Sequence, residues 1–383
     1  KDLLFLGTEL GVFFTVDGGK NWLELNGGMP TISTRDVKIQ RRENDLIAGT
    51  FGRGIYILDD YAPLRNLSAK AMENEALLFA PSRPVKWFSL DSNHTRSDGN
   101  DRFSAKNPAH GATLTYFLKD NLLTTKEKRQ KTEKAMVKED KYPKYPTWEK
   151  IEKENQEPKP SIYIEITDES GSFVNRIQGK TSKGLHRVTW DMTFGKTTTV
   201  LKHKLSGASI LAPPGKYNAT LFSRNGSQVN QLANPVEFQL QAIYQPSIKA
   251  NPEKDVLEFG KQLVNAQRRS SSVANVFEEM DEMLKMLRLA IDATPNNISS
   301  LETDFAEIKD QFYAIKLELY GLKSQDRKGS KPATISSRLS YAMSANWSTY
   351  GPTIQHQEQL SYALKAFDDV AKRINLLQMK SIP

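Results

Sequence analysis

A short pattern of glycine, threonine, apolar and aspartate residues occurs twice near the start of the chain. The first copy spans residues 6–17 and the second spans residues 48–60, so the second copy contains one additional residue. Each copy has the order Gly-Thr, then Gly followed by three apolar or aromatic residues, then Asp. A repeat of about 40–50 residues built from short alternating strands and glycine turns is typical of a β-propeller blade. The repeat therefore predicts two propeller blades.

The first copy continues into a turn with a specific residue pattern. Residues 15–22, Thr-Val-Asp-Gly-Gly-Lys-Asn-Trp, follow the Asp-box pattern S/T-x-D-x-G-x-T-W that starts at Thr15, with Asn in place of the second Thr. We expect the Asp17 carboxylate to accept backbone N–H groups of its own turn, Gly19 to supply a positive φ, and Trp22 to pack the hairpin onto the next layer. We favour this structural role for Asp17 over a catalytic one, because the Asp-box occurs in proteins of many activities.

The residues around the repeat resemble those of a known family. The Asp-box blade and the segments 49–65, 78–81, 184–192 and 212–217 are similar to sortilin-like BNR-repeat proteins exported by bacteria. The resemblance implies the last blades of an exported propeller, a sandwich domain and a helical tail. Because two blades leave sheet faces and edges open, we expect the other blades upstream or on another chain. The glycosyl hydrolase label common in this family rests on the Asp-box, so no catalytic residue is carried over.

Alternating β-rich segments lie between residues 67 and 250. Gly, Pro, Asn and Ser turns separate them, and this pattern predicts one antiparallel β-sandwich. The sequence Pro-Pro-Gly-Lys-Tyr at 213–217 is common in fibronectin type III-like modules. The predicted strands are 76–79, 85–88, 112–118, 161–166, 173–177, 186–190, 216–222 and 236–240.

Two insertions interrupt the predicted sandwich. Residues 91–110 are polar and turn-rich, whereas residues 119–159 are dense in Lys and Glu and begin with a predicted helix at 125–138. Three aromatic residues follow in a predicted loop: Tyr142, Tyr145 and Trp148. Aromatic residues among lysines are typical of nucleic-acid or glycan grooves, but the neighbouring acidic residues cancel much of the charge. We therefore expect the aromatics to hold the loop onto the domain, and a partner surface is the alternative.

From residue 252 onward, apolar residues recur three or four positions apart, which predicts an antiparallel bundle of three long helices. The predicted helices are 254–291, 298–322 and 360–377, with a short helix around 335–345. We expect Met280, Met283 and Met286 to pack in the core. The sequence thus predicts a multi-domain β plus α protein, with propeller blades at 1–66, a fibronectin type III-like sandwich with insertions at 67–250 and a helical bundle at 251–383.

Few residues carry a recognisable catalytic or metal-binding pattern. The chain has no cysteine, which excludes disulfides and thiolate chemistry, and its five histidines lack the spacing of metal ligands. We favour a turn or capping role for the adjacent Asp59 and Asp60, because neighbours in a strand point to opposite faces. Arg53 is a candidate contact for an anionic ligand, with a structural ion pair as the alternative. We therefore expect no metal and no cofactor.

The predicted function rests on two observations. The predicted domains are of kinds that commonly serve as spacers or contact surfaces, and the sequence contains no recognisable catalytic pattern. No apolar run approaches the roughly 20 residues of a membrane span, and the net charge of +8 permits anionic partners without requiring them. We expect a non-catalytic interaction or scaffold protein, exported to the bacterial periplasm, outer membrane or cell surface. It would dock in a larger assembly through protein partners, with a glycan as a further class of partner and no nucleic acid. The alternative is a sialidase-like glycoside hydrolase with its active site on upstream blades.

Overall fold

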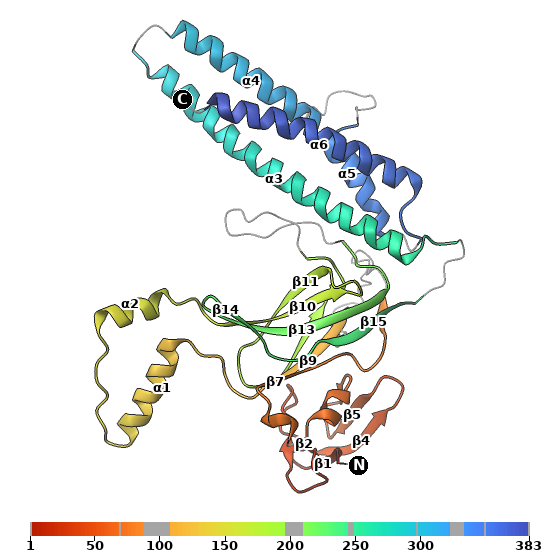
Figure 1. Cartoon of the computed structure of the whole chain (residues 1–383). Helices are drawn as coiled ribbons and strands as arrows, with labels where there is room; N and C mark the ends of the chain where they lie inside the picture. Colours follow the sequence, from red (N-terminus) through yellow and green to blue (C-terminus); the bar gives the residue numbers. More distant parts are fainter. Residues whose placement is uncertain are drawn as a thin grey trace. The chain divides into compact units, whose positions relative to one another are not determined.

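The computed structural model shows a mixed β and α protein whose chain divides into two compact units (Figure 1). The first unit consists of Lys1–Met192 and Pro214–Ile243, and the second consists of Thr193–Pro213 and Tyr244–Pro383. The structure describes residues 2–68, 70–87, 108–195, 210–243, 249–295, 298–321, 333–347 and 350–381. Most of the predicted insertion at 91–110 lies outside these residues. The predicted domain limits 1–66, 67–250 and 251–383 remain predictions.

The N-terminal part of the first unit forms two three-stranded antiparallel sheets. The sheets have the orders β1–β2–β3 and β4–β5–β6, and their strands are β1 (Leu4–Thr8), β2 (Gly11–Thr15), β3 (Leu23–Glu24), β4 (Thr34–Gln40), β5 (Asp45–Thr50) and β6 (Ile55–Leu58). The two copies of the sequence repeat form the hairpins β1–β2 and β5–β6. In each copy the threonine hydroxyl donates to the carbonyl of the glycine after the turn, Thr8 to Gly11 at 3.1 Å and Thr50 to Gly54 at 2.6 Å. The same local pattern therefore forms the same hairpin twice.

These two sheets pack on each other through one apolar face each. A Cβ atom at Gly7 on β1 would lie 3.0 Å from the Thr34 carbonyl oxygen and 3.1 Å from the Val37 side chain on β4, so glycine permits the close approach. The buried residues of this core are Val12, Leu46, Ala48, Tyr61, Leu64 and Leu67. Side chains alternate between the faces of a strand, and those on the two outer faces are exposed. Large apolar residues on the outer faces include Leu6, Ile55 and Ile57, which are exposed.

Two further sheets form the second part of this unit. Their orders are β12–β9–β7 and β11–β10–β13–β15–β8, and β14 also pairs with β13. Their strands are β7 (Ala76–Phe79), β8 (Val85–Trp87), β9 (Ala112–Leu118), β10 (Ser161–Asp168), β11 (Phe173–Gly179), β12 (Gly184–Trp190), β13 (Gly215–Asn225), β14 (Gln228–Gln231) and β15 (Val236–Ala242). The buried Trp190 ring of β12 packs edge-on against Tyr217 at 5.2 Å and Phe238 at 5.9 Å, both on the other sheet. These aromatic contacts lie in the core between the two layers.

One strand pairing in these sheets is parallel, whereas the predicted sandwich is antiparallel throughout. Strand β8 pairs with β15 in parallel, with Val85 opposite Leu240 and Trp87 opposite Ala242. The alternating pattern of each strand reports which face is buried but not which strand lies beside it, so sequence reasoning missed this pairing. All other pairings in these two sheets are antiparallel.

The second unit is helical. Its elements are α3 (Glu253–Asp292), α4 (Ser299–Tyr320), α5 (Ile335–Met343), a 3₁₀ helix (Ser344–Trp347) and α6 (Ile354–Ser381). The long helices α3, α4 and α6 run side by side (Figure 1). The residues predicted from helical spacing form most of the buried surface: Phe259, Leu263, Phe277, Met280, Leu284, Phe312, Ile315, Leu319, Leu360, Phe367, Ile374 and Leu377. Helical periodicity therefore predicted this unit well.

The segment before β13 contributes to the helical unit. Phe194 is buried, and its amide donates to the Ile210 carbonyl at 2.8 Å. Its ring lies 3.0 Å from the position that a Cβ atom would occupy at Gly260 of α3. Glycine at this position therefore lets an aromatic side chain from outside the helices reach the α3 backbone.

We predict that residues 251–383, expressed alone, give a strongly helical circular dichroism spectrum, because α3, α4 and α6 bury one another's apolar faces. The fragment lacks Phe194, so we expect its melting temperature to fall below that of the helical transition in the full chain. The full chain is the control. A random-coil spectrum of the fragment would show that these helices require the rest of the protein.

Candidate functional site

The Asp-box turn is organised around the Asp17 carboxylate. Its Oδ1 atom accepts the backbone N–H groups of Lys20 and Asn21, both at 3.0 Å, and the Thr15 hydroxyl at 2.7 Å. Its Oδ2 atom accepts from Asn21 Nδ2 at 2.8 Å. Asn21 thus supplies a side-chain donor at the position where the motif usually has Thr.

The remaining Asp-box residues complete the turn. Gly18 and Gly19 have φ values of 74° and 101°, and the Gly19 amide donates to the Thr15 hydroxyl at 3.1 Å. The Trp22 ring lies over Gly19 and is partly exposed. The hydrogen bonds from Asn21 and Thr15 hold the pKa of Asp17 far below its ordinary value. Every donor to Asp17 comes from its own turn, which is the arrangement of a structural carboxylate.

We predict that Asp17→Ala lowers the melting temperature at pH 7, because four donors lose their acceptor. The folded-state pKa is depressed, so the ionised carboxylate stabilises the fold above its unfolded-state pKa of about 4. The difference from the wild type should therefore shrink as the pH falls below about 4. Lys20→Ala is the control, since only the backbone of Lys20 takes part in the turn. A pH-independent difference would contradict this account.

Arg187 connects β12 with the end of the second N-terminal sheet. It donates from Nη2 to the Asp60 carbonyl at 2.6 Å, and three carboxylates, those of Asp45, Asp59 and Asp60, raise its pKa. Burial has the larger, opposite effect, so the pKa of Arg187 is lowered overall. The contact joins residues that are far apart in the sequence, and sequence reasoning did not single out Arg187.

Asp59 and Asp60 have different surroundings. Asp60 has a φ of 40°, and its carboxylate accepts the amides of Ala62 at 3.2 Å and Ser82 at 3.1 Å. These bonds give Asp60 the turn role that the sequence favoured. Burial raises the pKa of Asp59, the nearby Asp45 raises it further, and Arg187 acts in the opposite direction. Asp59 and Asp60 therefore have a structural role where the end of β6 meets β12.

We predict that Asp59→Asn raises the melting temperature at pH 7. The pKa of Asp59 is raised in the folded state, so ionisation of this carboxyl destabilises the fold at neutral pH, and a neutral amide removes that effect. The gain should disappear below about pH 4, where the carboxyl is protonated in both states. Asp120→Asn, at an exposed position, is the control. A loss of stability at pH 7 would show that attraction to Arg187 outweighs burial.

Arg53 lies in the exposed turn between β5 and β6. Among the residues that the structure describes, no carboxylate lies within ion-pair distance of its guanidinium. The neighbouring Phe51 is also exposed and has Arg35 over its ring at 5.3 Å. The structural ion pair expected as the alternative for Arg53 is therefore not formed with any described residue.

The Lys- and Glu-rich insertion forms a helical pair, which we call the arm. It consists of α1 (Thr125–Lys138), α2 (Trp148–Gln156) and the segment between them (Figure 1). The predicted helix matches α1, whereas the stretch around Trp148, predicted as a loop, begins helix α2. The sequence signal for α2 is Thr147, whose hydroxyl accepts the Lys150 amide at 3.4 Å and caps the helix.

A buried ion pair holds the two helices together. Arg129 on α1 donates to Glu154 on α2 from Nε at 2.9 Å and from Nη2 at 2.7 Å, and to Glu133 from Nη1 at 2.7 Å. The Glu154 side chain is almost fully buried, and the hydrogen bonds from Arg129 lower its pKa. Glu157 accepts the Thr125 amide at 2.8 Å. The base of the arm is therefore a defined structure.

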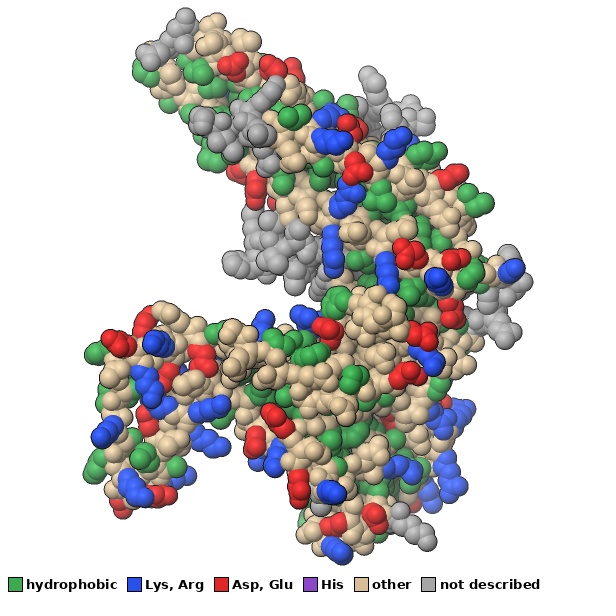
Figure 2. Space-filling model, viewed as in Figure 1, with side chains coloured by type: hydrophobic (Ala, Val, Ile, Leu, Met, Phe, Trp, Pro, Cys, Tyr) green, Lys and Arg blue, Asp and Glu red, His purple; other side chains and the backbone are tan. Residues whose placement is uncertain are grey.

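The aromatic side chains of the arm face solvent. Tyr142 is 96% exposed, Tyr145 is 82% exposed and Trp148 is 80% exposed. The expectation that they hold the loop onto the domain is therefore wrong. The Leu122 amide donates to the Thr181 carbonyl at 2.9 Å, and the Lys183 amide donates to the Asn121 side chain at 2.8 Å, which connects the arm to the domain. Figure 2 shows hydrophobic side chains among Lys and Glu on the arm. These three residues remain candidates for partner contact.

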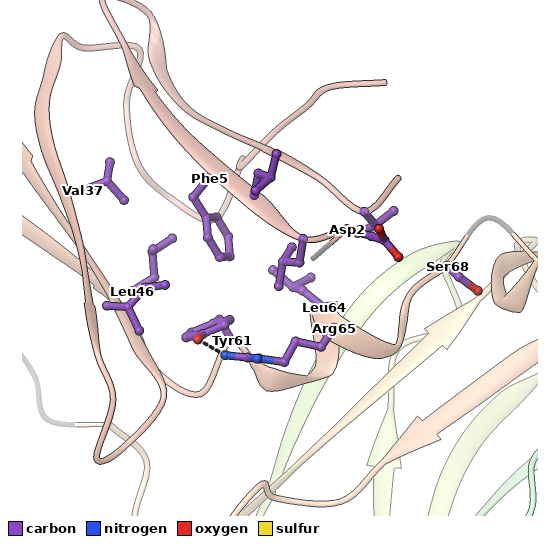
Figure 3. A pocket seen from close by; sticks show the side chains of 12 residues that line it. Asp2, Phe5, Val37, Leu46, Tyr61, Leu64, Arg65 and Ser68 are labelled. Carbon is purple, nitrogen blue, oxygen red and sulfur yellow. Dashed lines mark hydrogen bonds between the residues drawn. The ribbon is translucent and has the colours of Figure 1, made fainter. Parts of the chain in front are cut away.

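A cavity of about 410 Å³ lies between the two N-terminal sheets (Figure 3). It is lined by apolar side chains such as Phe5, Val37 and Leu46, with Asp2 and Arg65 as its charged residues. Arg65 donates to the Tyr61 hydroxyl and lies over the Tyr61 ring at 5.0 Å. The one cation in the lining is thus already engaged, and the cavity is mainly part of the core between the sheets.

The predicted methionine cluster is divided between core and surface. Met280 is buried, whereas Met283 and Met286 are exposed, so the expectation of core packing is correct only for Met280. The two exposed methionines line a groove of about 840 Å³ on α3 and α4. The groove is bordered by four acidic residues: Glu278, Glu279, Asp281 and Glu282.

Searches for other sites and for related proteins give negative results. Within the described ranges, no group of three or more His, Asp or Glu side chains is arranged to hold a metal ion, and His94 and His203 lie outside those ranges. No helix in the described part of the chain has the length and apolar character needed to cross a membrane. A scan against protein-family models finds no match, and a search of curated proteins finds no similar sequence.

Proposed function

We propose that the N-terminal sheets are blades of an Asp-box propeller, that the next two sheets form a fibronectin type III-like sandwich, and that the helical unit is a bundle. The first assignment is supported by the two hairpins with the same hydrogen bond and by the exposed apolar residues on both outer sheet faces. A blade packs against a neighbour on each face, so these outer faces are suited to further blades. The parallel pairing of β8 with β15 is the main departure from the sandwich.

We propose that the protein is a non-catalytic interaction or scaffold protein of the bacterial cell envelope or surface. The observation that carries this proposal is the arm, which displays three exposed aromatic side chains on a base clamped by Arg129 and Glu154. Tyr and Trp supply much of the binding energy at protein surfaces and lose little conformational entropy on binding. An ordered arm that buries few of its own apolar residues is best explained as a docking element.

The glycoside hydrolase alternative receives less support from the described residues. Catalysis of that kind requires two carboxyl groups on either side of a scissile bond. In the described residues, Asp17 is saturated by its own turn, and Asp59 and Asp60 serve a structural junction. The cavity between the sheets offers a single carboxylate, that of Asp2.

We predict that a variant with Tyr142→Ser, Tyr145→Ser and Trp148→Ser loses co-sedimentation with purified bacterial cell-envelope fragments, with the bound fraction reduced about tenfold. Replacement of residues 121–157 by a Gly/Ser linker should have the same effect. Both variants should melt at the same temperature as the wild type, because these aromatic side chains contribute nothing to the core. The matched control carries Lys131→Ala, Lys134→Ala and Lys138→Ala on the exposed surface of α1. Unchanged sedimentation of the aromatic variant would contradict the docking role.

A further inference from the structure

The segment between α1 and α2 has an extended backbone. Helix α1 ends at Lys138, Asp140 has a φ of 54°, and the Lys141 amide donates to the Met136 carbonyl at 2.9 Å. The next residues read Lys-Tyr-Pro-Lys-Tyr-Pro-Thr-Trp, so each tyrosine precedes a proline. Proline fixes its own φ near −65° and excludes the preceding residue from the helical region. Thr147, the N-cap of α2, has φ −66° and ψ 155°, which lie in the polyproline II range. The two prolines favour the same conformation in residues 142–146.

A polyproline II helix places every third residue on the same side. Its period is three residues, with a rise of about 3.1 Å per residue. Tyr142 and Tyr145 have this spacing, and Trp148, the first residue of α2, follows three residues later; we call these three side chains the aromatic row. The half-buried Pro143 and Pro146 form a second row with the same period. The observed burial thus repeats every three residues, as the polyproline geometry requires.

The third side of the segment carries positive charge. Lys141 and Lys144 are three residues apart and form what we call the lysine row. Residues 141–148 contain no acidic side chain. Lys141 contacts Glu139 at 2.9 Å in an exposed ion pair, which contributes little to stability, and Lys144 is exposed. A ligand that covers the aromatic row therefore meets cations along one edge.

The spacing of the aromatic row distinguishes between classes of ligand. In a polyproline II helix, residues three apart are separated by about 9 Å along the axis, which is the spacing expected for these rings. In protein interfaces the dominant aromatic residues cluster in one closely packed centre, whereas these rings are held apart at regular intervals. A polymer whose flat, apolar faces repeat at the same interval fits this arrangement. An extended β-linked polysaccharide has a disaccharide repeat of similar length, and each sugar presents an apolar face of C–H groups.

We propose that the aromatic row binds an extended, β-linked acidic polysaccharide with one carboxylate in each disaccharide. Alternate sugar faces stack on Tyr142, Tyr145 and Trp148, and the carboxylates lie beside Lys141 and Lys144. Because prolines restrict the backbone and the helix ends hold it at both sides, little conformational entropy is lost on binding. This inference rests on the proposed docking function and specifies its ligand.

The test is isothermal titration of the full chain with hyaluronan oligosaccharides of increasing length. Affinity should rise until the oligosaccharide spans the aromatic row, about 19 Å, and then level off. Tyr145→Ala should weaken binding of the longest oligosaccharide about tenfold. The matched control exchanges two neighbours, Lys144→Tyr with Tyr145→Lys, which keeps the composition and charge but moves one ring to the lysine row. This variant should bind as weakly as Tyr145→Ala.

Two further ligands distinguish stacking of sugars on the aromatic row from attraction to the lysine row. Neutral chitin oligosaccharides of equal length should bind about tenfold more weakly than hyaluronan. Polyaspartate, which has charge but no sugar face, should not bind. Absence of hyaluronan binding, wild-type affinity of the exchanged variant, or equal binding of polyaspartate would each overturn the inference. If sedimentation with envelopes still depends on the aromatic row in that case, the docking function stands and its ligand is a protein.

Discussion

Two parts of the first unit meet where Arg187 of β12 contacts the carboxylate-rich end of the second N-terminal sheet. The guanidinium donates to the Asp60 carbonyl, and Asp45, Asp59 and Asp60 all lie near it. Arg187 and Asp59 are both exposed, so this is a contact between charged groups at the surface of the first unit. The contact links β12 with the turn that follows β6.

The turns of the protein, unlike the Arg187 contact, are held by residues that are close in the sequence. Thr15, Asp17 and Asn21 satisfy one another within a single hairpin, and the hydrogen bond from Thr8 to Gly11 is repeated by Thr50 and Gly54. Such turns require no distant partner. They form the edges of sheets whose outer faces stay apolar and exposed, which is consistent with stacking against further sheets.

The arm combines rigidity with exposure. Its helices are joined by the Arg129–Glu154 pair, whereas its aromatic row contributes to no core. A side chain that is ordered by its backbone but packs against nothing in its own chain is available to a ligand at low entropic cost. The physical basis of the proposed docking and glycan binding is therefore the restricted polyproline backbone.

Features with short-range causes were determined by the sequence alone. The hairpin repeat, the Asp-box turn around Asp17 and the long helices follow from turn chemistry and from a period of 3.6 residues. The limits of α1, α3, α4 and α5 agree closely with the predicted ones, whereas α6 extends beyond its predicted limits at both ends. The tertiary structure alone decided the parallel β8–β15 pairing, the partners of Arg187 and the exposure of Tyr142, Tyr145 and Trp148. These depend on which distant segments meet, and a pattern of neighbouring residues holds no information about partners far along the chain.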